Sequence, residues 1–183
     1  MSAAAELRWV HWRARLGFPL AAVCLWFARP SPDSILAGAA IGLAGLGIRA
    51  AAAGHLRKGE TVAMSGPYAR TRNPLYLGSA LLAAGFVAAS QSWVVAVLVA
   101  AYYLALYPFL MRREEAELRA KFGSVFDEYA RRVPLFWPRL RGQGGAAGSH
   151  FSWERYARNR EYQVAMGMAA LLAGLWVLSI WRR

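Results

Sequence analysis

"NPLYLGSALLAAGFVAASQSWVVAVLVAAYYLALYPFLM", residues 73–111, carries no charged side chain in 39 consecutive positions. A helix rises about 1.5 Å per residue, so this stretch can cross a hydrocarbon layer of about 30 Å twice. The segment "ASQS", residues 89–92, divides it. We therefore predict a tight hairpin of two membrane-spanning helices, over 74–90 and 92–111.

Three further apolar runs complete the predicted membrane domain, at residues 16–28, 34–53 and 162–181. The first has thirteen uncharged residues, so it either extends towards the N-terminus or does not fully cross. Gly38, Gly42 and Gly45 have the small side chains and spacing that let helices approach closely. The sequence therefore predicts an all-α, polytopic helical membrane protein with about five transmembrane helices.

The basic residues are concentrated on one side of these predicted helices. Nineteen of the 22 Lys and Arg residues fall before the first run or within residues 49–72 and 112–160, and three are Arg29, Arg182 and Arg183. The positive-inside rule then places the N-terminus and the two loops in the cytoplasm and the C-terminus outside. This topology accounts for the net charge of +12, and no nucleic-acid-binding motif suggests a nucleic-acid partner.

Cysteine and histidine do not form a pattern typical of a metal site or a disulfide framework. The chain has one cysteine, Cys24, and three scattered histidines without a second ligand at metal-binding spacing. We therefore expect no metal ion. We also find no Ser-His-Asp or Cys-His arrangement and single out no catalytic residue.

Residues 112–133 are predicted to form a cytoplasmic amphipathic helix, with an interruption expected at Gly123. One apolar stripe recurs every three or four residues and consists of Leu118, Phe122, Phe126, Tyr129 and Val133. Ion pairs four residues apart are expected at Glu115–Arg119, Glu117–Lys121, Asp127–Arg131 and Glu128–Arg132. Residues 141–150 read as a Gly-rich linker between a membrane core, 1–140, and a C-terminal helical segment, 151–183.

Glu114 is the exception among these acidic residues. Leu110 and Leu118 occupy the positions four residues away on either side, so no local cation faces it. It lies at the mouth of a predicted span, where a carboxylate suits a cationic or hydroxyl-bearing ligand.

The stretch "GPYARTRNPLYLG", residues 66–78, joins two predicted spans. It contains two prolines, two arginines and two tyrosines, more than a simple turn requires. Its arginines and tyrosines could serve only as topogenic charges and interfacial anchors, with Pro74 starting a helix. However, it resembles the Gly-x-Tyr-x-x-x-Arg-His-Pro-x-Tyr-x-Gly signature of the isoprenylcysteine carboxyl methyltransferase and phospholipid methyltransferase superfamily. "EEAELRAKFGSVFDEYARRVPLFWP", residues 114–138, is similar to the C-terminal motif of that superfamily. The resemblance covers roughly residues 49–138.

The resemblance implies an integral membrane enzyme that takes S-adenosylmethionine from the cytoplasm and a lipophilic acceptor from the bilayer. The acceptor could be a prenylated carboxylate, an ethanolamine lipid, a small thiol or an isoprenoid. Arg113 is expected to contact this acceptor. By the same resemblance, the cofactor-binding residues are Thr61, Val62, Ala63, Tyr68, Asn73, Pro74, Leu75, Tyr76 and Glu114, and Arg72 can add a charge-assisted contact to the cofactor carboxylate.

Two residues depart from the superfamily pattern. Asn73 stands where a histidine is usual, and Phe126 stands where a tyrosine is common. Asparagine keeps a hydrogen-bond donor and an acceptor but cannot take up a proton near neutral pH. Methyl transfer from a sulfonium to a thiolate or carboxylate needs no base, whereas an amine acceptor must be unprotonated.

Two other functions remain open on sequence. The first is an NADPH-dependent membrane reductase of the sterol-reductase type, which shares this architecture and an arginine-rich turn. Its acidic motif tends to have an Asp-Glu pair followed by Cys, whereas this chain has Glu114, Glu115 and Leu118. The second is a helical membrane adaptor without enzymatic activity, which would bind neither S-adenosylmethionine nor NADPH.

Overall fold

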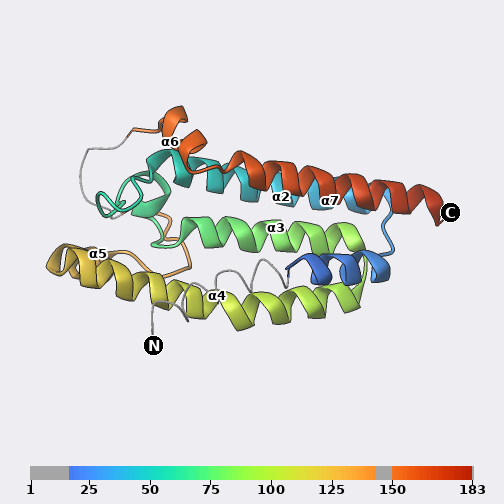
Figure 1. The fold of residues 1–183 in the computed structure, drawn as a ribbon, viewed down its shortest axis with the longest axis horizontal. Helices are drawn as coiled ribbons and strands as arrows, with labels where there is room; N and C mark the ends of the chain where they lie inside the picture. The colour runs from blue at the N-terminus through green and yellow to red at the C-terminus, as the bar shows by residue number, and fades with distance from the viewer. Residues whose placement is uncertain (1–16, 143–149, 183) are drawn as a thin grey trace.

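The computed structural model describes residues 17–142 and 150–182, and all of the regular structure in these residues is helical (Figure 1). The elements are the helix Gly17–Phe27, α2 (Pro32–His55), η1 (Gly66–Ala69), α3 (Pro74–Ser90), α4 (Trp93–Phe122), α5 (Ser124–Arg132), α6 (Trp153–Arg158) and α7 (Tyr162–Trp181). The predicted all-α class is confirmed.

Three of these helices, α2, α4 and α7, are long and apolar enough to cross a membrane. The other two of the about five predicted transmembrane helices are present as shorter apolar helices, Gly17–Phe27 and the 17-residue α3. Large apolar side chains point outwards from all three long helices, including Leu36, Leu104 and Met166, each about two thirds exposed. Such a surface is stable against lipid, and the chain is a helical membrane protein.

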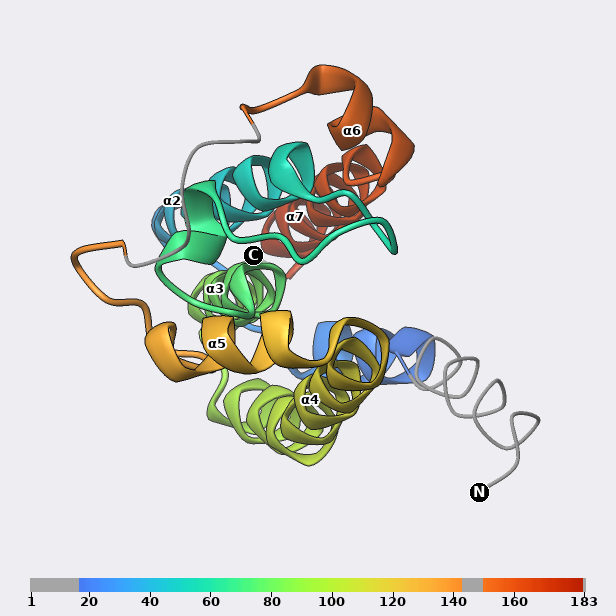
Figure 2. The ribbon, with the colours of Figure 1, turned by 90° about the vertical axis from the view of Figure 1, so that its left-hand side faces the viewer.

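The bundle is built around α3, which lies between α2 and α7 on one side and α4 on the other (Figures 1 and 2). Glycines allow the close contact between α2 and α3. A Cβ added to Gly38 would lie 2.3 Å from the carbonyl oxygen of Gly85, and one added to Gly45 would lie 2.7 Å from that of Gly78. The predicted close approach at Gly38 and Gly45 is therefore confirmed, and a Cβ at Gly42 would clash with Met168 of α7.

The helix α4 continues past the predicted end of its span. Its 30 residues form one helix to Phe122, so the expected boundary near residue 111 is not a break. At about 1.5 Å per residue the helix is roughly 45 Å long, which exceeds the hydrocarbon thickness and carries its charged end out of the membrane. The chain breaks at Gly123, where φ is +53°, as predicted, and α5 follows.

The apolar stripe of the amphipathic segment packs against the protein. Phe126, Tyr129 and Val133 form a buried cluster, and Leu118 and Phe122 pack on it. Val62 and Met64, from the loop between α2 and α3, cover the same cluster. This contact fixes the loop over the charged end of α4.

The C-terminal helices are joined to the core through the end of α2. The backbone N–H of Ser152 and the Nε–H of Arg155 donate to the carbonyl of Gly54, and Asn159 Nδ2 donates to that of Ala53. These donors satisfy carbonyls that a helix C-terminus leaves without intrahelical partners. Most of the predicted linker 141–150, namely residues 143–149, lies outside the described residues, as does Leu16 of the first predicted run.

Candidate functional site

The site is organised by the N-terminus of α3. Asn73 precedes the helix and Pro74 is its first residue, as predicted, but the Asn73 side chain does not cap the helix. Its Nδ2 group donates instead to the carbonyl of Leu135, at 2.9 Å. The first-turn N–H groups of Leu75 and Tyr76 therefore have no side-chain cap, and the helix dipole adds a positive potential there.

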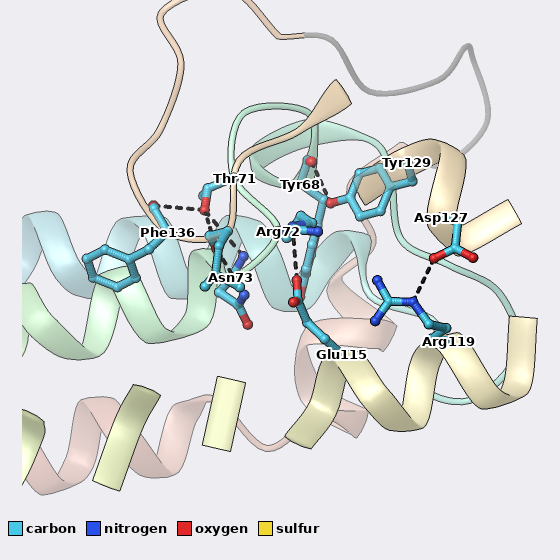
Figure 3. Close-up of polar contacts among 10 residues, drawn as sticks. Tyr68, Thr71, Arg72, Asn73, Glu115, Arg119, Asp127, Tyr129 and Phe136 are labelled. Atoms are coloured by element: carbon cyan, nitrogen blue, oxygen red, sulfur yellow. Dashed lines mark hydrogen bonds and ion pairs between the residues drawn. The ribbon is translucent and has the colours of Figure 1, made fainter. Parts of the chain in front are cut away.

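The two motifs found in the sequence are bound to each other at this point (Figure 3). The N–H of Arg72 donates to the carbonyl of Pro134 at 2.9 Å, and the Thr71 hydroxyl donates to that of Phe136 at 2.9 Å. The N–H of Arg139 donates to the carbonyl of Arg70 at 3.0 Å. Segments 70–73 and 134–139 thus form one backbone-bonded unit, although about 60 residues separate them in the chain.

Two buried tyrosines lie beside this unit. The Tyr129 hydroxyl donates to the carbonyl of Tyr68 at 2.8 Å (Figure 3). Burial raises the pKa of both phenols above the ordinary tyrosine value. Both therefore remain protonated near neutral pH and cannot act there as general bases.

Arg72 faces a carboxylate from α4. Its Nε lies 3.0 Å from Oε1 of Glu115, and both side chains are about 85% buried. The contact is an ion pair without an aligned hydrogen bond between these two atoms. The four-residue spacing predicted that Glu115 pairs with Arg119. In the structure Glu115 lies against Arg72, which belongs to the motif at residues 66–78.

Two more of the predicted local ion pairs are wrong. Asp127 binds Arg119 at 2.7 Å, so it does not pair with Arg131, and Glu117 binds Arg113 at 2.9 Å. Lys121 donates to the carbonyl of Gly59 at 2.6 Å. Of the four expected pairs only Glu128–Arg132 is present: Glu115, Arg119 and Lys121 bind residues outside the expected spacing, and Glu117 binds Arg113, four residues before it.

Glu114 has a partner that comes from outside its helix. The Tyr76 hydroxyl donates to its Oε1 atom at 2.7 Å. The Tyr76 ring meets Tyr107 edge to face at 5.4 Å, and the Tyr103 hydroxyl donates to the Tyr76 carbonyl at 2.7 Å. Glu114 is therefore held at the α3–α4 interface beside two aromatic rings.

Tyr76, Tyr107 and Glu114 line a cleft of about 570 Å³ at the α3 N-terminus. Its lining comes from the loop after α2, from the turn before α3 and from all the long helices. The lining residues are Arg49, Lys58, Tyr68, Arg72, Asn73, Pro74, Leu75, Tyr76, Ser79, Leu82, Tyr107, Glu114, Glu161 and Val164.

Most of the residues named from the sequence lie together in this cleft. Tyr68, the run from Arg72 to Tyr76, and Glu114 all line it. Thr61, Val62 and Ala63 do not line it, and Val62 packs on the apolar cluster around Phe126. Arg113 also lies outside the lining and binds Glu117.

Sequence reasoning missed several lining residues, chiefly Arg49, Lys58, Tyr107 and Glu161. Arg49 and Glu161 carried a weak signal, since each is a charged residue within or beside an otherwise apolar run. Such charges in a membrane segment usually mark a functional or paired site. Their pairing could not be found, because it joins residues 112 positions apart.

Two apolar cavities adjoin the cleft. One, of about 280 Å³, lies between α2, α3 and α7 and shares Leu82 and Val164 with the cleft. The other, of about 640 Å³, lies between the helix Gly17–Phe27, α4 and α7, and shares Tyr107 with the cleft. Among the described residues, no group of three or more His, Cys, Asp or Glu side chains could hold a metal ion.

Comparison with known proteins gives one family and two relatives. Residues 40–125 match the phospholipid methyltransferase family model. The chain is 38% identical over 103 residues to the cobalt-zinc-cadmium resistance protein CzcN of Cupriavidus metallidurans, covering 52% of this chain and 47% of that protein. It is 33% identical over 116 residues to the nickel-cobalt-cadmium resistance protein NccN of Alcaligenes xylosoxydans xylosoxydans, covering 59% and 54%.

The aligned region spans about half the length of these curated relatives. No solved structure matches the chain significantly. The matched segment 40–125 contains the N-terminus of α3 and Glu114, but it ends before the 134–139 segment and before α7.

Proposed function

We propose that this chain is a membrane methyltransferase that uses S-adenosylmethionine, because residues 40–125 match the phospholipid methyltransferase family model. The proposed acceptor is a lipophilic molecule taken from the bilayer. The observation that carries this proposal is the cleft, in which the turn before α3 and the charged end of α4 bring Tyr68, Asn73, Tyr76 and Glu114 together.

The chemistry of the cleft fits the proposed cofactor. Its volume of about 570 Å³ lies within the usual range of small-molecule sites, about 300–1,000 Å³. The uncapped N–H groups of Leu75 and Tyr76 suit an anionic group, and the Glu114 carboxylate suits an ammonium or ribose hydroxyls. The rings of Tyr76 and Tyr107 suit a cationic sulfonium.

When bound, S-adenosylmethionine supplies a methyl group on a positively charged sulfur. The chain's own residues then have to align the two reactants and exclude water. The paired segments 70–73 and 134–139 hold the turn before α3 rigidly, and the Tyr103 hydroxyl fixes the Tyr76 backbone. The main contribution of these residues is therefore to hold the cofactor and the acceptor in a fixed alignment.

Proton transfer is not part of the proposed chemistry. The Asn73 amide does not titrate near neutral pH, and the raised pKa of Tyr68 keeps its phenol protonated. An acceptor that arrives as a thiolate or carboxylate needs no base from these residues. An amine acceptor would have to arrive unprotonated.

The apolar cavity of about 640 Å³ between the helix Gly17–Phe27, α4 and α7 gives the acceptor a route to the cleft. Gly17, Phe18, Leu106 and Leu110 are among its apolar lining residues, and Tyr107 belongs to both the cavity and the cleft. An apolar chain in this cavity would place its head group near Tyr107. The proposed partners are therefore membrane lipids or lipid-linked molecules.

The direct test is to incubate the purified protein with methyl-labelled S-adenosylmethionine and extracted membrane lipids, and to identify the labelled product. We expect label in the lipid fraction, and about tenfold less label when Glu114→Gln is used at the same cofactor concentration, below the dissociation constant of the wild type. Binding of NADPH with no binding of S-adenosylmethionine would favour the reductase instead. Binding of neither ligand would favour the adaptor.

The proposed orientation places the cleft in the cytoplasm, with the N-terminus inside and the C-terminus outside. It rests on the distribution of nineteen basic residues against three. On a Cys24→Ser background, Gln91→Cys should react with an impermeant reagent in intact cells, whereas Gly142→Cys should not. If Gly142→Cys reacted and Gln91→Cys did not, the orientation would be the opposite of the one proposed.

A second candidate function is a role in metal resistance, because the names of both relatives refer to it. The test is growth of a metal-sensitive host on cobalt, zinc or cadmium, with the wild type and with Glu114→Gln. Protection by the wild type but not by the variant would make the cleft necessary for resistance. Equal protection by both would separate resistance from the proposed methyl transfer.

A further inference from the structure

The charges in the cleft differ in how fully they are already engaged. Three basic side chains line it, Arg49, Lys58 and Arg72, together with the acidic side chains of Glu114 and Glu161. An anionic group of a ligand would bind most strongly to the cation whose charge no carboxylate of the protein already balances. The contacts of each cation identify it.

Arg49 is almost fully occupied. Its Nε and Nη2 groups donate to the two oxygens of Glu161, and Nη1 donates to the Leu75 carbonyl and to the Ser79 hydroxyl. These four bonds engage four of the five N–H groups of a guanidinium. Arg49 therefore has little capacity for an added anion.

Arg72 is also compensated. Its guanidinium lies against the Glu115 carboxylate, and its backbone N–H is bonded to Pro134. The pair is mostly buried, so the charge of Arg72 is already balanced by a carboxylate 3.0 Å away.

Lys58 differs from both. Its side chain is exposed at the rim of the cleft and makes no hydrogen bond or ion pair with any residue that the structure describes. It lies in the turn after α2, next to Gly59, which has φ of +78°. Lys121 of α4 donates to the Gly59 carbonyl at 2.6 Å, so this turn is anchored beside the cleft.

We propose that Lys58 binds the carboxylate of the amino-acid end of S-adenosylmethionine. A lysine ammonium offers three N–H donors and a compact charge to such a carboxylate. The same cleft contains Glu114, so both charges of an α-amino acid group meet an opposite charge. This inference rests on the proposed function and goes beyond the family motif, which does not include Lys58.

The test compares two ligands by calorimetry on the full-length protein in detergent: S-adenosylmethionine and its decarboxylated analogue, which lacks only the carboxylate. Lys58→Met should weaken binding of the first about three- to tenfold, the range of a partly exposed charge contact. It should change binding of the analogue less than about twofold, because the interaction it removes is absent there. Lys58→Arg, which keeps the charge, should retain most of the affinity.

Arg57→Met is the matched control. Arg57 precedes Lys58, is also exposed and lies outside the cleft lining, so this change removes the same charge without the proposed contact. It should affect both ligands equally and weakly. An equal loss for both ligands with Lys58→Met, or no loss for either, would overturn the assignment of Lys58. If the wild type bound neither ligand, the proposed cofactor itself would be wrong.

Discussion

Arg49 of α2 and Glu161 at the start of α7 form a two-point ion pair in the wall of the cleft. The distances are 2.8 Å from Nε to Oε2 and 2.7 Å from Nη2 to Oε1, and the side chains are 15% and 10% exposed. Arg49 passes over Gly78, where a Cβ would lie 2.5 Å from its Cγ atom, and also binds Leu75 and Ser79 of α3. One guanidinium thus connects three helices.

The first prediction concerns the stability that this pair provides. Glu161→Gln should lower the free energy of unfolding by about 3 kcal/mol, because it leaves Arg49 buried without its counter-charge. Arg49→Met combined with Glu161→Gln should cost less than the sum of the single changes, since the double variant removes both charges. Thermal unfolding in detergent measures both effects.

Asp127→Asn is the control for that measurement, because it breaks the exposed Arg119–Asp127 pair, whose side chains are 52% and 47% exposed. Exposed pairs contribute about 0–1 kcal/mol, so the unfolding temperature should hardly change. Equal effects of Glu161→Gln and Asp127→Asn would show that the Arg49–Glu161 pair is not a structural connection.

The second prediction separates Glu114 from its neighbour. Glu114→Gln should weaken S-adenosylmethionine binding by about tenfold and leave the unfolding temperature unchanged, because the amide can still accept the Tyr76 hydrogen bond. Glu115→Gln should lower the unfolding temperature, because it removes the counter-charge of the mostly buried Arg72. Calorimetry and thermal unfolding measure the two effects. If both variants lost the same cofactor affinity and the same unfolding temperature, this assignment would be contradicted.

The comparison of sequence and structure shows which contacts follow from local patterns. The helix α3 was predicted over its observed range because its apolar run is bounded by Pro74 and Gln91. An apolar segment in a membrane has to satisfy its backbone hydrogen bonds internally, which favours a helix. The break between α4 and α5 followed from Gly123. Pro108 lies three residues before residue 111 but does not end α4, which continues into its charged part.

The ion pairs could not be predicted in the same way. A four-residue spacing offers Glu115 a neighbour in Arg119, but the turn before α3 brings Arg72 against it, and Arg119 binds Asp127 across the α4–α5 break. The Arg49–Glu161 pair depends on how α2 and α7 pack, which no local pattern encodes. The family motif was informative because it had already grouped Tyr68, Asn73 and Tyr76, which do line one cleft.

The third prediction concerns Tyr129 at high pH. Burial is the main reason why the pKa of this phenol is raised in the folded protein. The folded state therefore holds this proton more tightly than the unfolded chain does, and the free energy of unfolding should fall as the pH rises above the ordinary tyrosine value of 10.0. This contribution is fully present below that pH.

Tyr129→Phe tests this dependence. At neutral pH the variant should be about 1–2 kcal/mol less stable, because the Tyr68 carbonyl loses its buried donor. Above a pH of about 10 the difference from the wild type should shrink, since phenylalanine cannot lose a proton. Urea titrations at both pH values measure it, and Tyr162→Phe, at a residue that is 44% exposed, is the control. A difference that stays constant with pH would refute the alkaline effect.

The last prediction concerns Asn73, where the chain departs from the superfamily signature. Its side chain donates to the Leu135 carbonyl and lies buried at the junction of the two motifs, which is a positioning role. Asn73→Ala should weaken both cofactor binding and stability, because it leaves that carbonyl with only the longer 3.3 Å contact from the Thr71 hydroxyl and loosens the start of α3. Asn73→His keeps a ring N–H donor, so its cofactor affinity should stay within a few-fold of the wild type.

The pH profile of turnover separates positioning from proton transfer. If Asn73 only orients the turn, the profile of Asn73→His should show no new inflection near a pH of about 6.5, the ordinary histidine value. A much faster Asn73→His variant, whose rate followed one ionisation near neutrality, would mean that a base limits the natural enzyme. The acceptor would then be an amine that must lose a proton, and the base-free displacement proposed for this cleft would be wrong.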